Sequence, residues 1–153
     1  MLLVHPQPPA LALGSSAPGI ALQDPQGRTH IVVGGGSTRA AFIEFLSTSC
    51  STCLSRLPAV CTAAATNTTV SVVAVDATGE SASALQAFAT QHVDSACPLT
   101  VLVDPGMSVS RAYEVGVIPT VYVVDSHGTI RFAGFGASGV QQGIAALGSA
   151  SNG

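Results

Sequence analysis

Two cysteines separated by two residues form the clearest chemical motif of this 153-residue chain, Cys50-Ser51-Thr52-Cys53. The apolar run 40–46 precedes the motif and has the length and composition of a buried strand. Residues 53–65 follow it and have the composition of a helix. The motif therefore falls where a strand passes into a helix, and its first thiol is expected near the helix N-terminus.

That position suits thiol–disulfide exchange. Unpaired backbone N–H groups and the helix dipole favour a negative sulfur at a helix N-terminus, and the thiolate is the nucleophile of disulfide exchange. We expect Cys50 to be the nucleophile and Cys53, one helical turn further and more buried, to be the resolving thiol. Ser51 and Thr52, which lie between them, are candidate substrate-binding residues.

A zinc site is the other common use of such a cysteine pair. No second Cys-x-x-Cys pair and no His-x-x-x-His pair completes a set of four ligands in this sequence. We therefore expect no bound metal and no cofactor.

Composition limits the partners of the chain. Charged residues make up 8%, the net charge is −3, and all five basic residues are arginines without a basic run, so the sequence offers no electrostatic support for nucleic-acid binding. No stretch reaches the roughly 18 apolar residues that a membrane span needs. The length suits one domain.

The domain is expected over residues 17–149. Residues 1–16 are interpreted as a flexible N-terminal lead-in or linker, since Pro6, Pro8 and Pro9 interrupt regular structure, and residues 150–153 as a flexible tail. The predicted elements are a hairpin (19–33), strands (40–46, 70–75, 99–103, 120–124, 129–135) and helices (53–65, 81–93, 107–113, 138–148). The alternating order predicts an α/β fold with a mixed central sheet flanked by helices.

Four separated features carry a resemblance to a known family. Residues 42–53 run from a strand into the cysteine motif, Glu44 lies six residues before the first cysteine, Pro58 lies five residues after the second, and Ile118-Pro119-Thr120 precedes the final hairpin. Together they resemble the thioredoxin superfamily. The layout is most similar to its TlpA/ResA-like branch, which has an N-terminal hairpin and an inserted helix–strand, supplied here by residues 81–103.

The resemblance implies roles for three further positions. Pro119 is expected to follow a cis peptide bond and to leave the Ile118 backbone free to bind a substrate strand; an ordinary trans proline at a strand start is the alternative. Glu44 is expected to accept the proton of the resolving thiol, unless it simply faces solvent. Glu80 is a candidate modulator, since members of the branch carry a Glu near the active site, or it merely opens the next helix.

Two departures from the family pattern leave the redox potential and its direction open. Ser49 stands where the family usually has Trp, and Ser51-Thr52 is neither Gly-Pro nor Pro-His. The remaining cysteines, Cys61 and Cys97, have two interpretations: a structural disulfide, which would suit an oxidising compartment, or two small buried apolar residues.

The sequence therefore predicts a thiol–disulfide oxidoreductase that acts on disulfide- or dithiol-bearing proteins and is served by an upstream redox partner. The resemblance implies an extracytoplasmic location with a membrane tether in some relatives, and a cytoplasmic location stays open. A peroxiredoxin-like peroxidase is one alternative, because Ser47 lies three residues before Cys50, although the Pro expected ahead of it is absent. A Sco-like copper-binding module is another, with His127 as the distant ligand.

Overall fold

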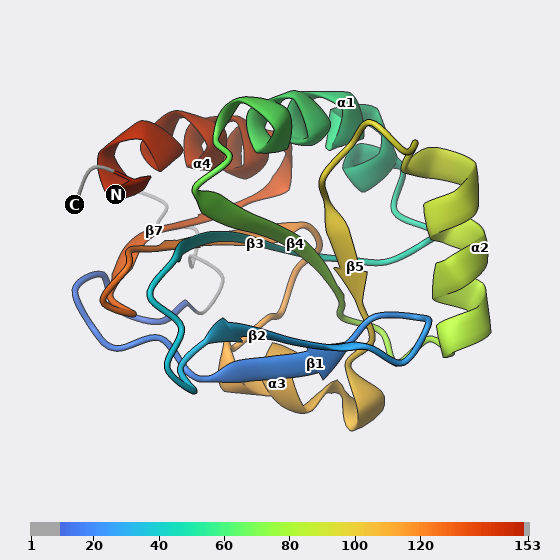
Figure 1. The fold of residues 1–153 in the computed structure, drawn as a ribbon, viewed down its shortest axis with the longest axis horizontal. Coiled ribbons are helices and arrows are strands. Elements are labelled where there is room, and N and C mark those ends of the chain that lie inside the picture. The colour runs from blue at the N-terminus through green and yellow to red at the C-terminus, as the bar shows by residue number, and fades with distance from the viewer. Residues whose placement is uncertain (1–9, 152–153) are drawn as a thin grey trace, which may run out of the picture.

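A five-stranded mixed sheet forms the centre of the computed structural model, which describes residues 10–151 (Figure 1). In spatial order its strands are β5 (Thr100–Leu102), β4 (Val70–Asp76), β3 (Ala40–Leu46), β6 (Thr120–Val124) and β7 (Ile130–Phe135). The strands β3, β4 and β5 are parallel to one another, whereas β6 pairs antiparallel with both β3 and β7. A separate antiparallel hairpin comprises β1 (Ile20–Gln23) and β2 (Thr29–Val33).

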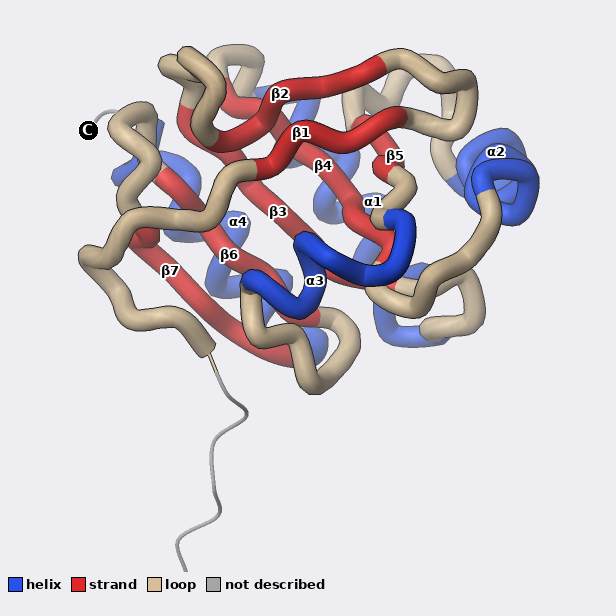
Figure 2. Tube along the Cα trace, turned by 90° about the horizontal axis from the view of Figure 1, so that it is seen from below, coloured by secondary structure: helices blue, strands red, loops and turns tan. Residues whose placement is uncertain are grey.

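The two faces of the sheet carry different elements. The helices α1 (Ser51–Thr66) and α4 (Gly136–Ser151) cover one face, and α2 (Ala82–His92) lies beside the β5 edge (Figure 1). The β1–β2 hairpin and the short helix α3 (Ser108–Ala112), which follows the 3₁₀ turn Pro105–Met107, cover the opposite face (Figure 2). The expected fold class, a mixed sheet flanked by helices with an N-terminal hairpin, is confirmed.

The central strand β3 is buried on both faces, which explains its continuous apolar sequence. Phe42 and Leu46 belong to the core beneath α1 and α4, and the alternate residues Ile43 and Phe45 belong to the core beneath the hairpin and α3. Because side chains alternate between the faces of a strand, this register also assigns Glu44 to the face covered by α1 and α4.

The ends of the domain differ in detail from the expected boundaries. The backbone N–H of Gly14 donates to the carbonyl of Ile130 at 2.8 Å, and the carbonyl of Ser15 accepts the N–H of Ile130 at 2.9 Å, so this part of the expected lead-in is hydrogen-bonded to the sheet. Residues 1–9 and 152–153 lie outside the described residues, while α4 continues through the buried Ala150. Within residues 10–151 no helix has the length and apolar character to cross a membrane.

A close glycine contact fixes α4 against β7. A Cβ atom added at Gly139 would lie 2.6 Å from the carbonyl carbon of Gly134, which is backbone and cannot move aside. We therefore predict that Gly139→Ala lowers the free energy of unfolding by about 1–3 kcal/mol, the usual cost of overpacking.

Urea unfolding measures this effect. Gly148→Ala is the matched control, because an added Cβ there meets nothing within 4 Å, and the better helix propensity of Ala predicts a gain of up to about 1 kcal/mol. Equal stabilities for the two variants would contradict this view of the α4–β7 packing.

Candidate active site

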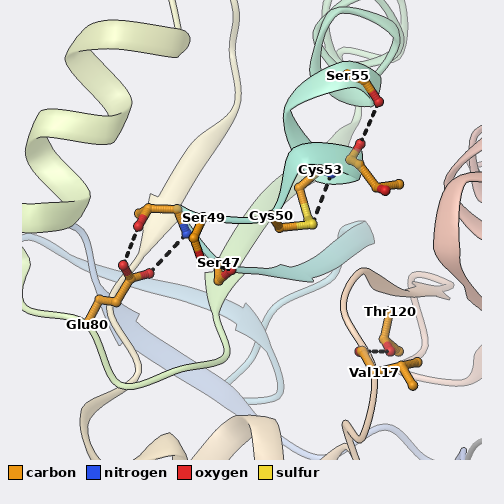
Figure 3. Close-up of a disulfide and its surroundings, with 10 residues drawn as sticks. Ser47, Ser49, Cys50, Cys53, Ser55, Glu80, Val117 and Thr120 are labelled. Carbon is orange, nitrogen blue, oxygen red and sulfur yellow. Dashed lines mark hydrogen bonds between the residues drawn. A yellow bond between two sulfur atoms is a disulfide. The ribbon is translucent and has the colours of Figure 1, made fainter.

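The two cysteines of the motif form a disulfide at the start of α1 (Figure 3). Cys50 is the N-cap residue of the helix, and its Sγ accepts a hydrogen bond from the backbone N–H of Cys53 at 3.1 Å. Cys50 is half-buried, whereas Cys53 is only 1% exposed. Of the two sulfurs, that of Cys50 is the one that a partner molecule can reach.

The position of Cys50 follows from the end of β3. After Leu46 the chain makes a turn in which the N–H of Cys50 donates to the carbonyl of Ser47 at 3.3 Å, and the N–H of Leu54 then donates to the carbonyl of Cys50 at 3.1 Å as a first helical bond. Pro58 is accommodated inside α1, one turn beyond Cys53. The disulfide is thus attached to the most buried strand of the sheet.

The turn before β6 lies in the surroundings of the disulfide (Figure 3). The Ile118–Pro119 peptide bond is cis, and the hydroxyl of Thr120 donates to the carbonyl of Val117 at 2.7 Å. Ile118 packs on the same buried cluster as Cys50, while Val117 is 38% exposed. The turn therefore presents one partly exposed apolar side chain, Val117, in the surroundings of the disulfide.

Glu44 is buried within β3, at 1% exposure, so it does not face solvent. It lies in register with Ala74 of β4 and Val121 of β6, on the face that also buries Cys53. Its Oε2 has no hydrogen-bond partner among the described residues. Burial raises the pKa of this carboxyl from 4.5 to about 7, which brings its proton exchange into the neutral range.

Glu80 is bound to the turn that precedes Cys50. Its Oε2 accepts a hydrogen bond from the backbone N–H of Thr48 at 3.1 Å, and its Oε1 accepts one from the Thr48 hydroxyl (Figure 3). The buried Asp76, at the end of β4, in turn accepts the backbone N–H of Glu80 at 2.6 Å. Glu80 therefore lies beside the site rather than only opening α2.

Sequence reasoning assigned no role to Thr48 or to Asp76. A usable signal was nevertheless present: Asp76 ends a strand parallel to β3, so the two strand ends meet at the same edge of the sheet. An acidic residue at that end, four residues before Glu80, points to the loop that holds Glu80 in place.

The second cysteine pair is also joined. The Cys61–Cys97 disulfide connects the middle of α1 to the loop that precedes β5, with Cα atoms 5.0 Å apart. Both residues are partly buried against the core beneath α1. The helix that carries the motif is thus cross-linked to the edge of the sheet.

The structure does not assemble the copper site that the Sco-like alternative requires. His127 lies in the turn between β6 and β7, where its N–H donates to Asp125. Since Val124 pairs with Ala41 at the start of β3, this turn is at the opposite end of the sheet from Cys50. Residues 10–151 contain no group of three or more His, Cys, Asp or Glu side chains arranged to hold a metal.

The fold and the disulfide site agree with the comparisons to known proteins. A model of the AhpC/TSA family matches residues 13–133, and the chain belongs to this family. A search of curated protein sequences gave no significant match.

Several solved structures share the fold. One is a protein from Chlorobium tepidum described as a putative thiol:disulfide interchange protein DsbE, with 23% identity over 90% of this chain and 99% of that one and a TM-score of 0.75. Another is a putative protein disulfide isomerase from Bacteroides thetaiotaomicron, with 14% identity over 94% of this chain and 92% of that one and a TM-score of 0.78. A secreted Mycobacterium tuberculosis disulfide oxidoreductase, described as homologous to DsbE, is also similar, with 18% identity over 83% of this chain and 95% of that one and a TM-score of 0.64. These findings confirm the thioredoxin fold and the resemblance to the thioredoxin superfamily, and they are consistent with its TlpA/ResA-like branch.

The raised pKa of Glu44 predicts a pH-dependent stability. In the unfolded chain this carboxyl ionises near 4.5 and in the folded protein near 7, so the folded state binds the proton more tightly. The stabilisation that this tighter proton binding gives to the folded state is therefore fully present below pH 4.5. It is lost as the pH rises to about 7, which lowers the free energy of unfolding by about 3 kcal/mol.

Urea unfolding of the oxidised protein at pH 5 and pH 8 tests this prediction. Glu44→Gln cannot ionise, so the difference in unfolding free energy between the two pH values should shrink by about 2.5 kcal/mol relative to wild type, because part of the contribution is already lost at pH 5. An unchanged difference would show that Glu44 is ionised in the folded protein at neutral pH.

The Cys61–Cys97 disulfide closes a loop across a sequence separation of 36. On the chain-entropy model, removing it should lower the free energy of unfolding by about 3–4 kcal/mol. Urea unfolding of Cys61→Ala/Cys97→Ala beside wild type measures the loss. A variant as stable as wild type would show that this bond does not constrain the unfolded chain.

Proposed function

We propose that this protein is a thiol–disulfide oxidoreductase that exchanges disulfides with partner proteins through Cys50 and Cys53. One observation carries the proposal: the two sulfurs are bonded at the N-cap of α1, with Cys50 accessible and Cys53 buried. An N-cap position stabilises a thiolate on the sulfur that a partner can reach.

The reduced form would act in two steps. The Cys50 thiolate attacks one sulfur of the partner's disulfide, so that a mixed disulfide forms and the partner's other sulfur leaves as a thiolate. Cys53 then loses its proton and attacks the Cys50 sulfur, which releases the second partner sulfur. The partner gains two electrons, the Cys50–Cys53 disulfide forms again, and an upstream redox partner must supply the next two electrons. The reverse sequence oxidises a dithiol.

Glu44 is the proton acceptor for Cys53 in this scheme. Both side chains are buried in the core beneath α1, where water cannot readily remove a proton. A carboxyl whose pKa is about 7 can accept the proton at neutral pH and return it when the direction reverses.

Partner binding is assigned to the surface around Cys50. The turn with the cis Ile118–Pro119 bond lies in the surroundings of the disulfide (Figure 3), while Ser51 is exposed and Thr52 half-buried at the start of α1. An extended partner segment could pair with the Ile118 backbone and place its own sulfur against Cys50.

An extracytoplasmic location accompanies this function. The second disulfide, Cys61–Cys97, suits an oxidising compartment, and the similar Mycobacterium tuberculosis protein is described as secreted.

Trapping of the mixed disulfide tests the proposal. In Cys53→Ser the resolving thiol is absent, so Cys50 should remain bonded to a disulfide-bearing model protein such as insulin and form an adduct visible on a non-reducing gel. Cys50→Ser is the matched control and should form none. Equal adducts from both variants would contradict the assigned roles, and rapid peroxide consumption without any adduct would favour the peroxidase alternative.

A further inference from the structure

Two carboxyl groups lie together at the end of β4, and neither belongs to the cysteine motif. Asp76 is fully buried. Its Oδ1 accepts hydrogen bonds from the N–H of Thr78 at 3.1 Å and from the Thr78 hydroxyl at 3.0 Å, and its Oδ2 accepts the N–H of Glu80 at 2.6 Å. The Asp76 carboxyl therefore fixes the loop from which the Glu80 side chain extends.

The Glu80 carboxyl reaches the turn before the cysteine motif. Thr48 offers it a backbone N–H and a hydroxyl, so that both carboxyl oxygens are engaged. Two residues of chain span at most about 7 Å, which brings the charge on Glu80 within electrostatic range of Cys50.

The hydrogens in this network do not suffice for two ionised carboxylates. The Thr78 hydroxyl lies 3.0 Å from Oδ1 of Asp76 and 3.2 Å from Oε2 of Glu80, yet a hydroxyl has one hydrogen to donate. Both contacts are satisfied when one of the two carboxyls is protonated and donates to the hydroxyl oxygen.

The surroundings indicate that Asp76 holds this proton. Burial raises its pKa, although hydrogen bonds from Thr78 and Glu80 work against the change. For Glu80 burial acts in the same direction, but the hydrogen bonds from Thr48 and the neighbouring Asp76 carboxyl keep its pKa below the ordinary value. When two carboxyls are adjacent, repulsion between their negative charges commonly leaves one proton shared between them.

The other groups that face the pair do not neutralise it. Neither carboxyl forms an ion pair with any residue in 10–151. Asp104 approaches from the loop after β5, where Ser110 contacts both its carboxyl, at 2.8 Å, and the backbone carbonyl of Asp76, at 3.4 Å. Cys50 lies on the β3–α1 turn, two residues after the Thr48 that binds Glu80.

On the basis of the proposed function, we infer that Asp76 is a positioning residue for the redox couple. It shares one proton with Glu80, and it thereby determines both where the Glu80 carboxyl lies beside Cys50 and what charge the two carboxyls carry. While the pair keeps its proton it carries one negative charge. When the pair loses the proton, a second negative charge opposes ionisation of Cys50. The thiol therefore ionises over a wider pH range than an isolated group would.

The test is the rate at which iodoacetamide alkylates Cys50 in the reduced protein between pH 5 and pH 9, with the modified peptide identified by mass spectrometry. Asp76→Asn keeps the size of the side chain but leaves Glu80 as a singly charged carboxylate at all these pH values. The variant and wild type should react equally near pH 5, and the variant should react roughly three to ten times faster above pH 7, the effect of one charge at this range.

Controls separate this effect from other causes. Asp125→Asn removes a carboxylate charge at the turn between β6 and β7, at the opposite end of the sheet from Cys50, and should follow the wild-type profile. Repeating the comparison in a Glu44→Gln background removes the carboxyl whose pKa burial raises to about 7. Thr78→Val deletes the shared hydroxyl at an exposed position but keeps both carboxyls. Without this donor the pair should hold its proton to higher pH, so the Cys50 profile should move away from that of wild type even if Asp76→Asn folds poorly.

Superimposable profiles for Asp76→Asn, Thr78→Val and wild type would overturn the inference, as would a loss of stability in these variants with no change in the pH profile. Because alkylation reports ionisation of Cys50 and not exchange with a partner, this outcome is distinct from failure of the proposed function, which the Cys53→Ser adduct reports.

Discussion

The junction between β3 and α1 determines the position of the two cysteines on which the candidate site depends. The strand is buried on both faces, so its end is held by packing from α1 and α4 on one side and from the hairpin and α3 on the other. The chain then enters a helix at Cys50, whose sulfur caps the first turn. A thiol placed further along the helix would lack the N-terminal N–H groups.

Two carboxyl environments surround this junction, and they differ in solvation. Glu44 lies in the apolar core without a partner for Oε2, so burial alone controls its charge. Glu80 is half-buried and fully hydrogen-bonded, and its neighbour Asp76 is the more deeply buried member of their pair. Glu44 lies in the core beneath the sulfurs, and Glu80 lies beside them. The first carboxyl can therefore respond to protons exchanged at Cys53, and the second to charge that develops at Cys50.

The sequence was sufficient for most of the fold, because the strands carry continuous apolar runs and the helices are bounded by polar turns. Every predicted strand and helix is present, with ends that differ by at most three residues. The chain from 107 to 113 was less regular than predicted, since Met107 takes a left-handed conformation and separates a 3₁₀ turn from α3. Local patterns contain no information about such a break.

The part of the candidate site formed by residues adjacent in the sequence was predictable. The part formed by contacts between distant loops was less so. Cys50 and Cys53 lie within one motif, so their placement needed only the strand–helix transition. The contact between Glu80 and Thr48 joins loops that are 32 residues apart, and the packing of two parallel strand ends creates it. Sequence analysis could name Glu80 through a family resemblance, but it could not identify the Thr48 and Asp76 groups that hold it.

The most direct test of the central claim is a glutathione-buffered redox titration of the Cys61→Ala/Cys97→Ala variant, with the thiol content of Cys50 and Cys53 followed by mass spectrometry. We expect one reversible two-electron transition, in which both cysteines change state together at a defined potential between those of strongly reducing and strongly oxidising dithiol proteins, about −270 to −120 mV. Absence of a reversible transition, or independent oxidation of the two thiols, would contradict the role of Cys50 and Cys53 as one redox couple.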